Sequence, residues 1–232
     1  MPLQKFSDRI CFLPTQPKLE RPLLAYIRGD RLSLAVDAGY SVRHLSEFYS
    51  GLDAAGLPRP DFTALTHWHC DHANALYAAS GLGIACGLSN KRLREHEIKC
   101  KEPGYRDYMI SRDPFFAAEY PEGEPITVVP APLEFDGGLT LDLGGVTAEL
   151  FLTEAPHGVD NVCILVREER TLFLGDAIYG DPDTGWGFDP ARLEALILSI
   201  ERADCDTCIA SHNSPHGKAS MLRLLRRKLE SL

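Results

Sequence analysis

Short apolar runs bounded by turn residues alternate along the chain with segments whose apolar positions recur at helical spacing. The runs Leu23–Arg28 and Arg31–Val36 flank Gly29-Asp30, a pair that is typical of a hairpin turn. From Ser41 to Ala55 the apolar residues lie mostly three and four positions apart, and Gly56 follows as a stop signal. This part of the chain therefore predicts a β-hairpin followed by a helix.

The remainder of the chain continues in the same way, with many short strands and a few helices. Strands are predicted over residues 9–13, 61–65, 83–86, 126–129, 139–143, 146–152, 162–166, 171–174 and 207–210. Helices are predicted over residues 73–79, 90–99, 190–202 and about 216–229. Residues 100–125 follow neither period. Their aromatic residues indicate cover for one edge of the core, with a substrate lid or a dimer contact as alternatives. This pattern by itself predicts a mixed α and β fold.

Length and composition narrow the class of protein. The chain has 232 residues, of which 44% are hydrophobic and 25% charged, which is ordinary for a globular protein with a substantial core. No linker or internal repeat divides it, so we predict one domain over residues 1–232. The net charge of −9 argues against nucleic-acid binding, which requires clustered cations, and against anionic membranes as partners.

Cysteine usage and the amino-terminal segment predict the compartment. The seven Cys are scattered, most of them within apolar runs, which indicates free thiols rather than a disulfide framework. Cys205-Asp-Thr-Cys208 is a single C-x-x-C without a partner pair, and we interpret it as packing at the start of a strand. The first residues carry no apolar signal-peptide core, and no apolar run approaches the length of a membrane span. We therefore expect a cytoplasmic protein without a membrane partner.

One stretch, Thr66–His72 (THWHCDH), concentrates the candidate chemistry, because it holds three imidazoles and a carboxylate. These are ligand types that bind zinc and similar divalent metals. Residues two apart in an extended segment share a face, so His67 and His69 can bind one cation. Asp71 and His72 lie past the predicted bend and can face a second cation. Asp71 also suits the start of the following helix as a capping carboxylate.

Three further side chains of the same kinds follow other predicted strands. His157, Asp176 and His212 each lie just past the carboxyl end of such a strand. Sites in layered α/β folds collect at strand ends, so these side chains meet the Thr66–His72 stretch if the strands are neighbours. The last of these loops also contains His216. His212 follows the strand directly and is the better candidate, and we place His216 at the start of the last helix.

With these residues the chain resembles the metallo-beta-lactamase superfamily, whose signature is H-x-H-x-D-H. The resemblance implies a four-layer αββα sandwich, in which helices cover two packed sheets. It also implies two metal sites, formed by His67, His69 and His157 and by Asp71, His72 and His212, with Asp176 bridging them. The cations would be two divalent ions, zinc in the first place, with iron or manganese as alternatives. The loop around His157 differs from the Gly-His-Thr-x-Gly-His of many such hydrolases, so the resemblance does not supply the substrate.

The resemblance further implies a reaction. A metal-activated water would hydrolyse an ester, lactone, thioester or related small substrate, and Asp71 would orient the water or shuttle its proton. Tyr179 is similar to a tyrosine of lactone-cleaving members that donates to the substrate carbonyl, and a core tyrosine is the alternative. Two other classes stay open, an iron-dependent dioxygenase-like oxidoreductase and a non-catalytic metal-binding domain. The expected partner is a small-molecule substrate, with a homodimer as a further option.

Overall fold

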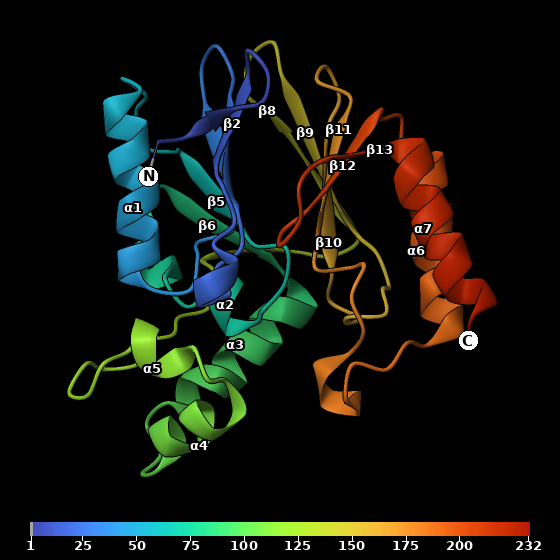
Figure 1. Cartoon of the computed structure of the whole chain (residues 1–232). Helices are drawn as coiled ribbons and strands as arrows, with labels where there is room; N and C mark the ends of the chain where they lie inside the picture. The colour runs from blue at the N-terminus through green and yellow to red at the C-terminus, as the bar shows by residue number, and fades with distance from the viewer. Residues whose placement is uncertain (1) are drawn as a thin grey trace.

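Two β-sheets form the centre of the protein in the computed structural model, which describes residues 2–232 (Figure 1). The strands of the first sheet lie in the order β1 (Gln4–Lys5), β2 (Ile10–Leu13), β3 (Leu24–Arg28), β4 (Ser33–Val36), β5 (Phe62–Ala64), β6 (Leu82–Cys86) and β7 (Leu133–Phe135). Those of the second lie in the order β13 (His216–Gly217), β12 (Thr207–Ala210), β11 (Thr171–Gly175), β10 (Val162–Val166), β9 (Thr147–Leu152) and β8 (Gly138–Asp142).

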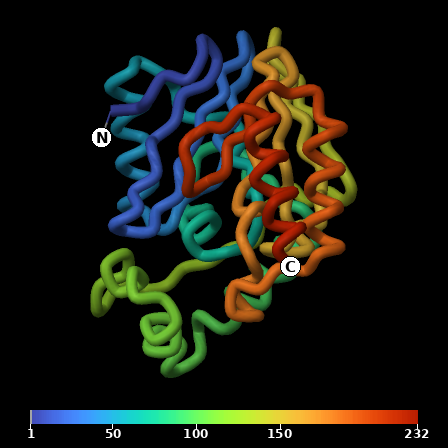
Figure 2. The backbone as a smooth tube through the Cα atoms, turned by 45° about the vertical axis from the view of Figure 1, so that its right-hand side comes forward, coloured from blue at the N-terminus to red at the C-terminus, as the bar shows by residue number. Residues whose placement is uncertain are grey.

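Helices cover the outer faces of both sheets (Figures 1 and 2). The helices of the described residues are α1 (Val42–Ala54), α2 (Cys70–Ala73), α3 (Gly87–Lys99), α4 (Tyr105–Arg112), α5 (Phe116–Glu119), α6 (Pro190–Arg202) and α7 (Lys218–Glu230). α1 lies outside the first sheet, and α6 and α7 lie side by side outside the second. The predicted four-layer αββα sandwich is thereby confirmed.

The central strands are buried on both faces, which is why their sequences are almost continuously apolar. In β3, Ala25 and Ile27 belong to the core between the sheets, whereas Leu24 and Tyr26 pack with α1. The alternation follows from the strand period of two. β10 divides in the same way, with Val162, Ile164 and Val166 between the sheets and Cys163 and Leu165 beneath α6 and α7, and the result is three stacked hydrophobic layers.

Strand direction decides where the loops that carry the candidate residues meet. β10 is antiparallel to both β9 and β11, and β11 is parallel to β12, so β9, β11 and β12 end at the same edge of the second sheet. In the first sheet β5 runs parallel to β4 and β6. The end of β5 meets the second sheet where the Val162 amide donates to the Thr66 carbonyl over 2.7 Å. Four strand ends therefore meet in one place.

The predicted helix over residues 73–79 is wrong, and the difference shapes the site. The segment instead forms α2 and, after a break, a 3₁₀ turn over Leu76–Ala78. α2 ends early because the His72 carbonyl accepts hydrogen bonds from the amides of Ala38 and Gly39, and the Ala75 amide donates to the Gly39 carbonyl. Hydrogen bonds to the residues that follow β4 thus replace the backbone hydrogen bonds that would continue α2. They also fix the Thr66–His72 stretch against the first sheet.

Residues 100–135 also differ from the prediction. The strand predicted over 126–129 does not form, and β7 takes its place beside β6. Pro130 and Pro132 lack the amide hydrogens that a ladder needs. The segment predicted to be irregular contains α4 and α5, and Phe116 and Tyr120 pack on Tyr40 as the predicted cover for a core edge. Among the described residues, none of the helices combines the length and apolar composition needed to cross a bilayer.

Candidate metal centre

The start of the motif is fixed by hydrogen bonds to the first sheet. Asp37 follows β4, and its carboxylate accepts from the Thr66 amide over 2.7 Å and from the Thr66 hydroxyl over 3.0 Å. Asp37 has φ of 65°, a left-handed conformation that Asp tolerates better than most residues. This turn aims the carboxylate back at the chain that leaves β5, so that the motif begins at a defined place.

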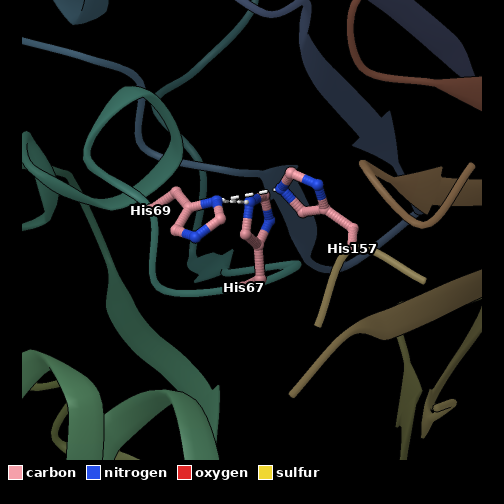
Figure 3. A group of neighbouring side chains, drawn as sticks. All are labelled: His67, His69 and His157. Carbon is pink, nitrogen blue, oxygen red and sulfur yellow. Dashed lines mark hydrogen bonds between the residues drawn. The ribbon is translucent and has the colours of Figure 1, made fainter. Parts of the chain in front are cut away.

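Three histidines form the first group of donors (Figure 3). His69 Nδ1 lies 3.0 Å from His67 Nε2 and 2.9 Å from His157 Nε2. The rings come from two different strand ends and turn these nitrogens toward one point. The group combines the predicted pair from the motif with the predicted third histidine from the loop after β9.

The second group joins two carboxylates and two imidazoles, and its members are Asp71, His72, Asp176 and His212. His212 Nε2 lies 3.1 Å from Asp71 Oδ2 and 3.4 Å from Asp176 Oδ2. His72 Nε2 lies 3.3 Å and 3.5 Å from the same two oxygens. Asp176 Oδ2 is also 3.8 Å from His157 Nε2, so this oxygen faces both groups.

The outer nitrogens of three rings have partners that set the orientation of each ring. His72 Nδ1 lies 2.8 Å from Asp37 Oδ2, and His157 Nδ1 lies 2.9 Å from the Gly180 carbonyl. His67 Nδ1 lies 3.1 Å from the Thr66 hydroxyl, which is itself bonded to Asp37. Because carboxylates and carbonyls only accept, the outer nitrogens of His72 and His157 carry a hydrogen, which leaves their Nε2 atoms to serve as the donors toward a cation at the centre. The sequence did not single out Asp37, although it follows an apolar strand as the predicted site residues do.

The electrostatics of the two groups differ. Burial lowers the pKa of His67 and of His69, that of His69 to about 3, so these imidazoles are neutral. Burial also lowers the pKa of His212, but Asp176 and Asp71 outweigh it and raise that pKa to about 10. Burial opposes ionisation of Asp71, but His72 and His212 hold its pKa well below the usual range. The second group thus pairs two carboxylates with imidazoles that hold a proton between them, and a bound cation would take the place of that positive charge.

The donor set fits divalent cations. Tetrahedral zinc, with Zn–N bonds of about 2.0–2.1 Å, would hold its nitrogens about 3.3 Å apart. The nitrogen pairs of the first group, at 3.0 and 2.9 Å, are close to that spacing. Among the described residues, His72 Nε2 and Asp176 Oδ1 are buried without a hydrogen-bond partner. Ligation of a cation would satisfy His72 Nε2, which faces Asp71 and Asp176.

The structure also bears on three further predictions, which concern Asp71, His216 and Tyr179. Asp71 does not cap α2: the capping position is His69, no side chain caps the helix, and the Asp71 carboxylate faces His212 instead. His216 is not at the start of the last helix but in β13, where it pairs with Cys208. The Tyr179 hydroxyl accepts from Asn213 Nδ2 over 2.7 Å, and its ring centroid is 6.1 Å from that of His212.

The loop after β11 forms one wall of the centre. Trp186 is 59% exposed, and its ring centroid lies 6.3 Å from that of His157. Gly180 approaches the Trp186 backbone so closely that a Cβ atom there would lie 2.1 Å from the Trp186 carbonyl oxygen. Position 180 therefore requires glycine, and the same residue supplies the carbonyl that orients His157.

Comparisons with known proteins agree with the fold described above. The profile of the metallo-beta-lactamase superfamily matches residues 25–230. The DIM-1 metallo-beta-lactamase is 18% identical, with a TM-score of 0.71, over 100% of this chain and 98% of that chain. A metallo-beta-lactamase superfamily protein from Sulfolobus tokodaii, ST1585, is 20% identical, with a TM-score of 0.67, over 96% of this chain and 87% of that chain. At these identities the two structures show the likeness of the fold.

Two curated proteins are similar in sequence. The acyl-coenzyme A thioesterase MBLAC2 of Gallus gallus is 27% identical over 197 residues, which are 76% of this chain and 64% of that protein. The putative transcription factor avaE of Aspergillus versicolor is 26% identical over 165 residues, which are 62% of this chain and 44% of that protein. The chain thus spans less than two thirds of the length of either relative.

Proposed function

The chain belongs to the metallo-beta-lactamase superfamily, and from this premise we propose that it is a metal-dependent hydrolase with a dinuclear centre. The observation that carries the proposal is the position of Asp176 Oδ2. It lies 3.4 Å from a nitrogen of the second group and 3.8 Å from one of the first, where a single carboxylate could bridge two cations. We propose zinc as the metal, with iron or manganese as alternatives.

Bound divalent cations would lower the pKa of a coordinated water toward about 7 and polarise a substrate carbonyl. The side chains around them then have separable roles. Asp71, at 3.1 Å from His212, would orient the attacking water and accept its proton. Hydrolysis by a metal-activated water requires no serine, cysteine or lysine nucleophile.

Tyr179 would act on the substrate rather than on the water. Asn213 Nδ2 donates to the Tyr179 hydroxyl oxygen, so the hydroxyl hydrogen is free to point elsewhere. The ring lies beside both His157 and His212, with centroid distances of 6.4 and 6.1 Å. From there the hydroxyl would donate to the carbonyl oxygen on which negative charge develops during hydrolysis.

Among the substrates that fit this chemistry, we place thioesters first. The similarity to the acyl-coenzyme A thioesterase of Gallus gallus supports this choice, at 27% identity. Esters and lactones present the same electrophilic carbonyl and remain in the proposed class.

A histidine at position 69 supplies a nitrogen that faces two other imidazoles, which is a donor set suited to zinc.

The test combines metal analysis with a substrate panel. The purified protein would be assayed for metal content and for turnover of matched acyl thioesters, esters and lactones, before and after removal of metal by a chelator. We expect thioester turnover that is lost with the metal and restored by zinc. His69→Ala and Asp176→Ala should lose both metal and turnover. Full turnover after complete removal of metal would refute the proposal, and oxygen consumption by an iron-loaded protein would favour an oxidoreductase instead.

A further inference from the structure

A second group of polar side chains lies beside the metal centre, where the Thr66–His72 stretch meets α3. Trp68 stands between His67 and His69 in the sequence, and its ring lies beside that of His69, with 4.9 Å between the centroids. The same indole ring lies 5.9 Å from the ring of His96 in α3. One aromatic side chain therefore connects the first group of donors to α3.

A small pocket is formed where Trp68, α3 and α4 come together. Its lining consists of Trp68, Arg92, Glu95, His96, Lys99 and Tyr105. The four residues from α3 recur at helical spacing and therefore share one face of the helix. The volume is about 40 Å³, which is room for about three water molecules. The pocket reaches the surface, because the side chains of Arg92 and Lys99 are exposed.

His96 is the buried member of this lining. It is 3% exposed, and among the described residues neither of its ring nitrogens has a hydrogen-bond partner. Burial lowers the pKa of His96 to about 4 and Lys99 acts in the same direction, so the imidazole is neutral and has one N–H to donate. A buried polar group without a partner destabilises the folded state, so a side chain that only packed here would be better as phenylalanine. The imidazole thus has a hydrogen bond available for a ligand.

The charge of the lining indicates which ligand fits. Arg92 and Lys99 outnumber the single carboxylate of Glu95, whose Oε2 is 3.4 Å from Arg92 Nη1 in an exposed and loose pair. The guanidinium carbon of Arg92 lies 6.0 Å from the centroid of the Trp68 ring. In a protein of net charge −9, a pocket with excess positive charge and a free N–H donor selects an anion. A carboxylate, with its few heavy atoms, matches the small volume.

We infer that this pocket, the α3 pocket, binds a carboxylate at the far end of a substrate whose scissile carbonyl reaches the metal centre, an inference that rests on the proposed function. Lys99 and Arg92 neutralise the carboxylate, and the His96 N–H donates to one of its oxygens. Trp68 and His69 are both partly exposed, so the substrate can cross the indole ring between pocket and donors. The preferred substrates are then acidic thioesters or esters rather than uncharged ones.

The test uses pairs of thioesters that differ only at the end remote from the carbonyl. Each acid is an acetyl thioester of an ω-mercapto carboxylic acid, its twin carries a neutral primary amide instead of the carboxylate, and the methylene chain is lengthened stepwise. For zinc-loaded wild-type protein we expect a chain length at which the KM of the acid is about tenfold below that of the amide. The two kcat values should be similar, because the pocket binds substrate and transition state alike.

Variants of α3 and its carboxyl end test the assigned contacts. Lys99→Met should raise the KM of that acid about tenfold and leave the KM of the amide unchanged, because only the acid uses the cation. Lys101→Met is the matched control: it removes the same charge outside the pocket lining, where Lys101 Nζ pairs with Glu97 at 2.9 Å, and should change neither KM.

His96→Phe separates ligand binding from packing. It should raise the KM of the acid without lowering the unfolding free energy, since no hydrogen bond within the protein is lost. An unchanged KM together with a lower unfolding free energy would show that His96 only packs. Lys99 is exposed, so Lys99→Met decides the central point even if His96→Phe fails to fold.

The outcomes distinguish this inference from the proposed function. If acid and amide are hydrolysed with equal KM at every chain length, the inference is overturned and the hydrolase stands. If neither is hydrolysed, the proposed function fails, and the intact thioesters serve as ligands in a calorimetric titration. Tighter binding of the acid than of the amide in wild type, lost in Lys99→Met, would then support the α3 pocket, and equal binding would overturn it.

Discussion

Substitution of Asp37 by asparagine should weaken metal binding although Asp37 is not itself placed among the metal donors. In the structure the carboxylate uses Oδ1 for the Thr66 amide, at 2.7 Å, and Oδ2 for His72 Nδ1, at 2.8 Å. Asparagine keeps the size of the side chain and tolerates the left-handed backbone at this position, where φ is 65°. It replaces one acceptor by an amide group that can only donate.

The consequence follows from the tautomer of His72. If the asparagine oxygen keeps its bond to Thr66, its amide faces His72 Nδ1, which then has to give up its hydrogen and become the acceptor. The hydrogen moves to Nε2, the nitrogen that faces Asp71 and Asp176. Loss of such an orienting partner typically costs about tenfold to a hundredfold in metal affinity, or about 1.4–2.7 kcal/mol.

The assay compares two variants that carry the same change: Asp61 precedes β5, and Asp37 follows its parallel neighbour β4. Asp61 Oδ2 accepts from the Ser33 amide at 2.8 Å and from the Ser33 hydroxyl at 2.9 Å, remote from the candidate site residues. Asp37→Asn should lose about 1–3 kcal/mol of unfolding free energy in a denaturant titration of metal-free protein, and Asp61→Asn should lose less, because the amide oxygen can take the place of Oδ2 toward Ser33. Only Asp37→Asn should lose zinc more readily to a competing chelator. Equal zinc affinity in wild type and Asp37→Asn would refute the reasoning.

Three further predictions concern the surroundings of the site. Tyr179→Phe should lower kcat by about a hundredfold with little change in metal content, and an unchanged kcat would remove Tyr179 from the mechanism. Gly180→Ala should displace the segment that contacts the Trp186 carbonyl and thereby reduce both zinc affinity and turnover. Wild-type zinc affinity and turnover in this variant would show that the loop after β11 does not form a wall of the centre. Glu119→Ala should cost about 1–3 kcal/mol in unfolding free energy, because the buried guanidinium of Arg21 loses its bidentate partner and keeps only Glu47 and Gln16. If chemical denaturation shows a loss of unfolding free energy below about 1 kcal/mol, the Arg21–Glu119 ion pair does not stabilise the position of α5.

The candidate metal donors could be proposed from the sequence because each follows a short apolar strand. The apolar run that ends at Ala210 is followed by polar residues where the chain leaves the sheet. His212 is the second of them, and its position after the strand made it a candidate. Asp37 follows Val36 in the same manner, but an isolated aspartate after a hairpin strand matches no ligand spacing. Its role depends on hydrogen bonds to Thr66 and His72. These residues lie 29 and 35 positions further along the sequence, and only folding brings them close to Asp37.

The regions that sequence reasoning missed are those whose shape is decided by long-range contacts. α4 and α5 lie in a segment of prolines and aromatic residues without helical periodicity, and Phe116 and Tyr120 are ordered by packing on Tyr40. The early end of α2 reflects hydrogen bonds from Ala38 and Gly39, which local propensity does not register. The predicted packing role of Cys205 and Cys208 is confirmed, since both belong to the core beneath α6 and α7.

The account depends most on the claim that Asp176 stands between two bound cations. Anomalous diffraction at the zinc absorption edge, from crystals of protein loaded with zinc, tests it most directly. The account predicts two anomalous peaks, one within reach of His67, His69 and His157 and the other within reach of Asp71, His72 and His212, with Asp176 in contact with both. Zinc-loaded crystals without a peak between these side chains, or with zinc bound only elsewhere on the protein, would contradict it.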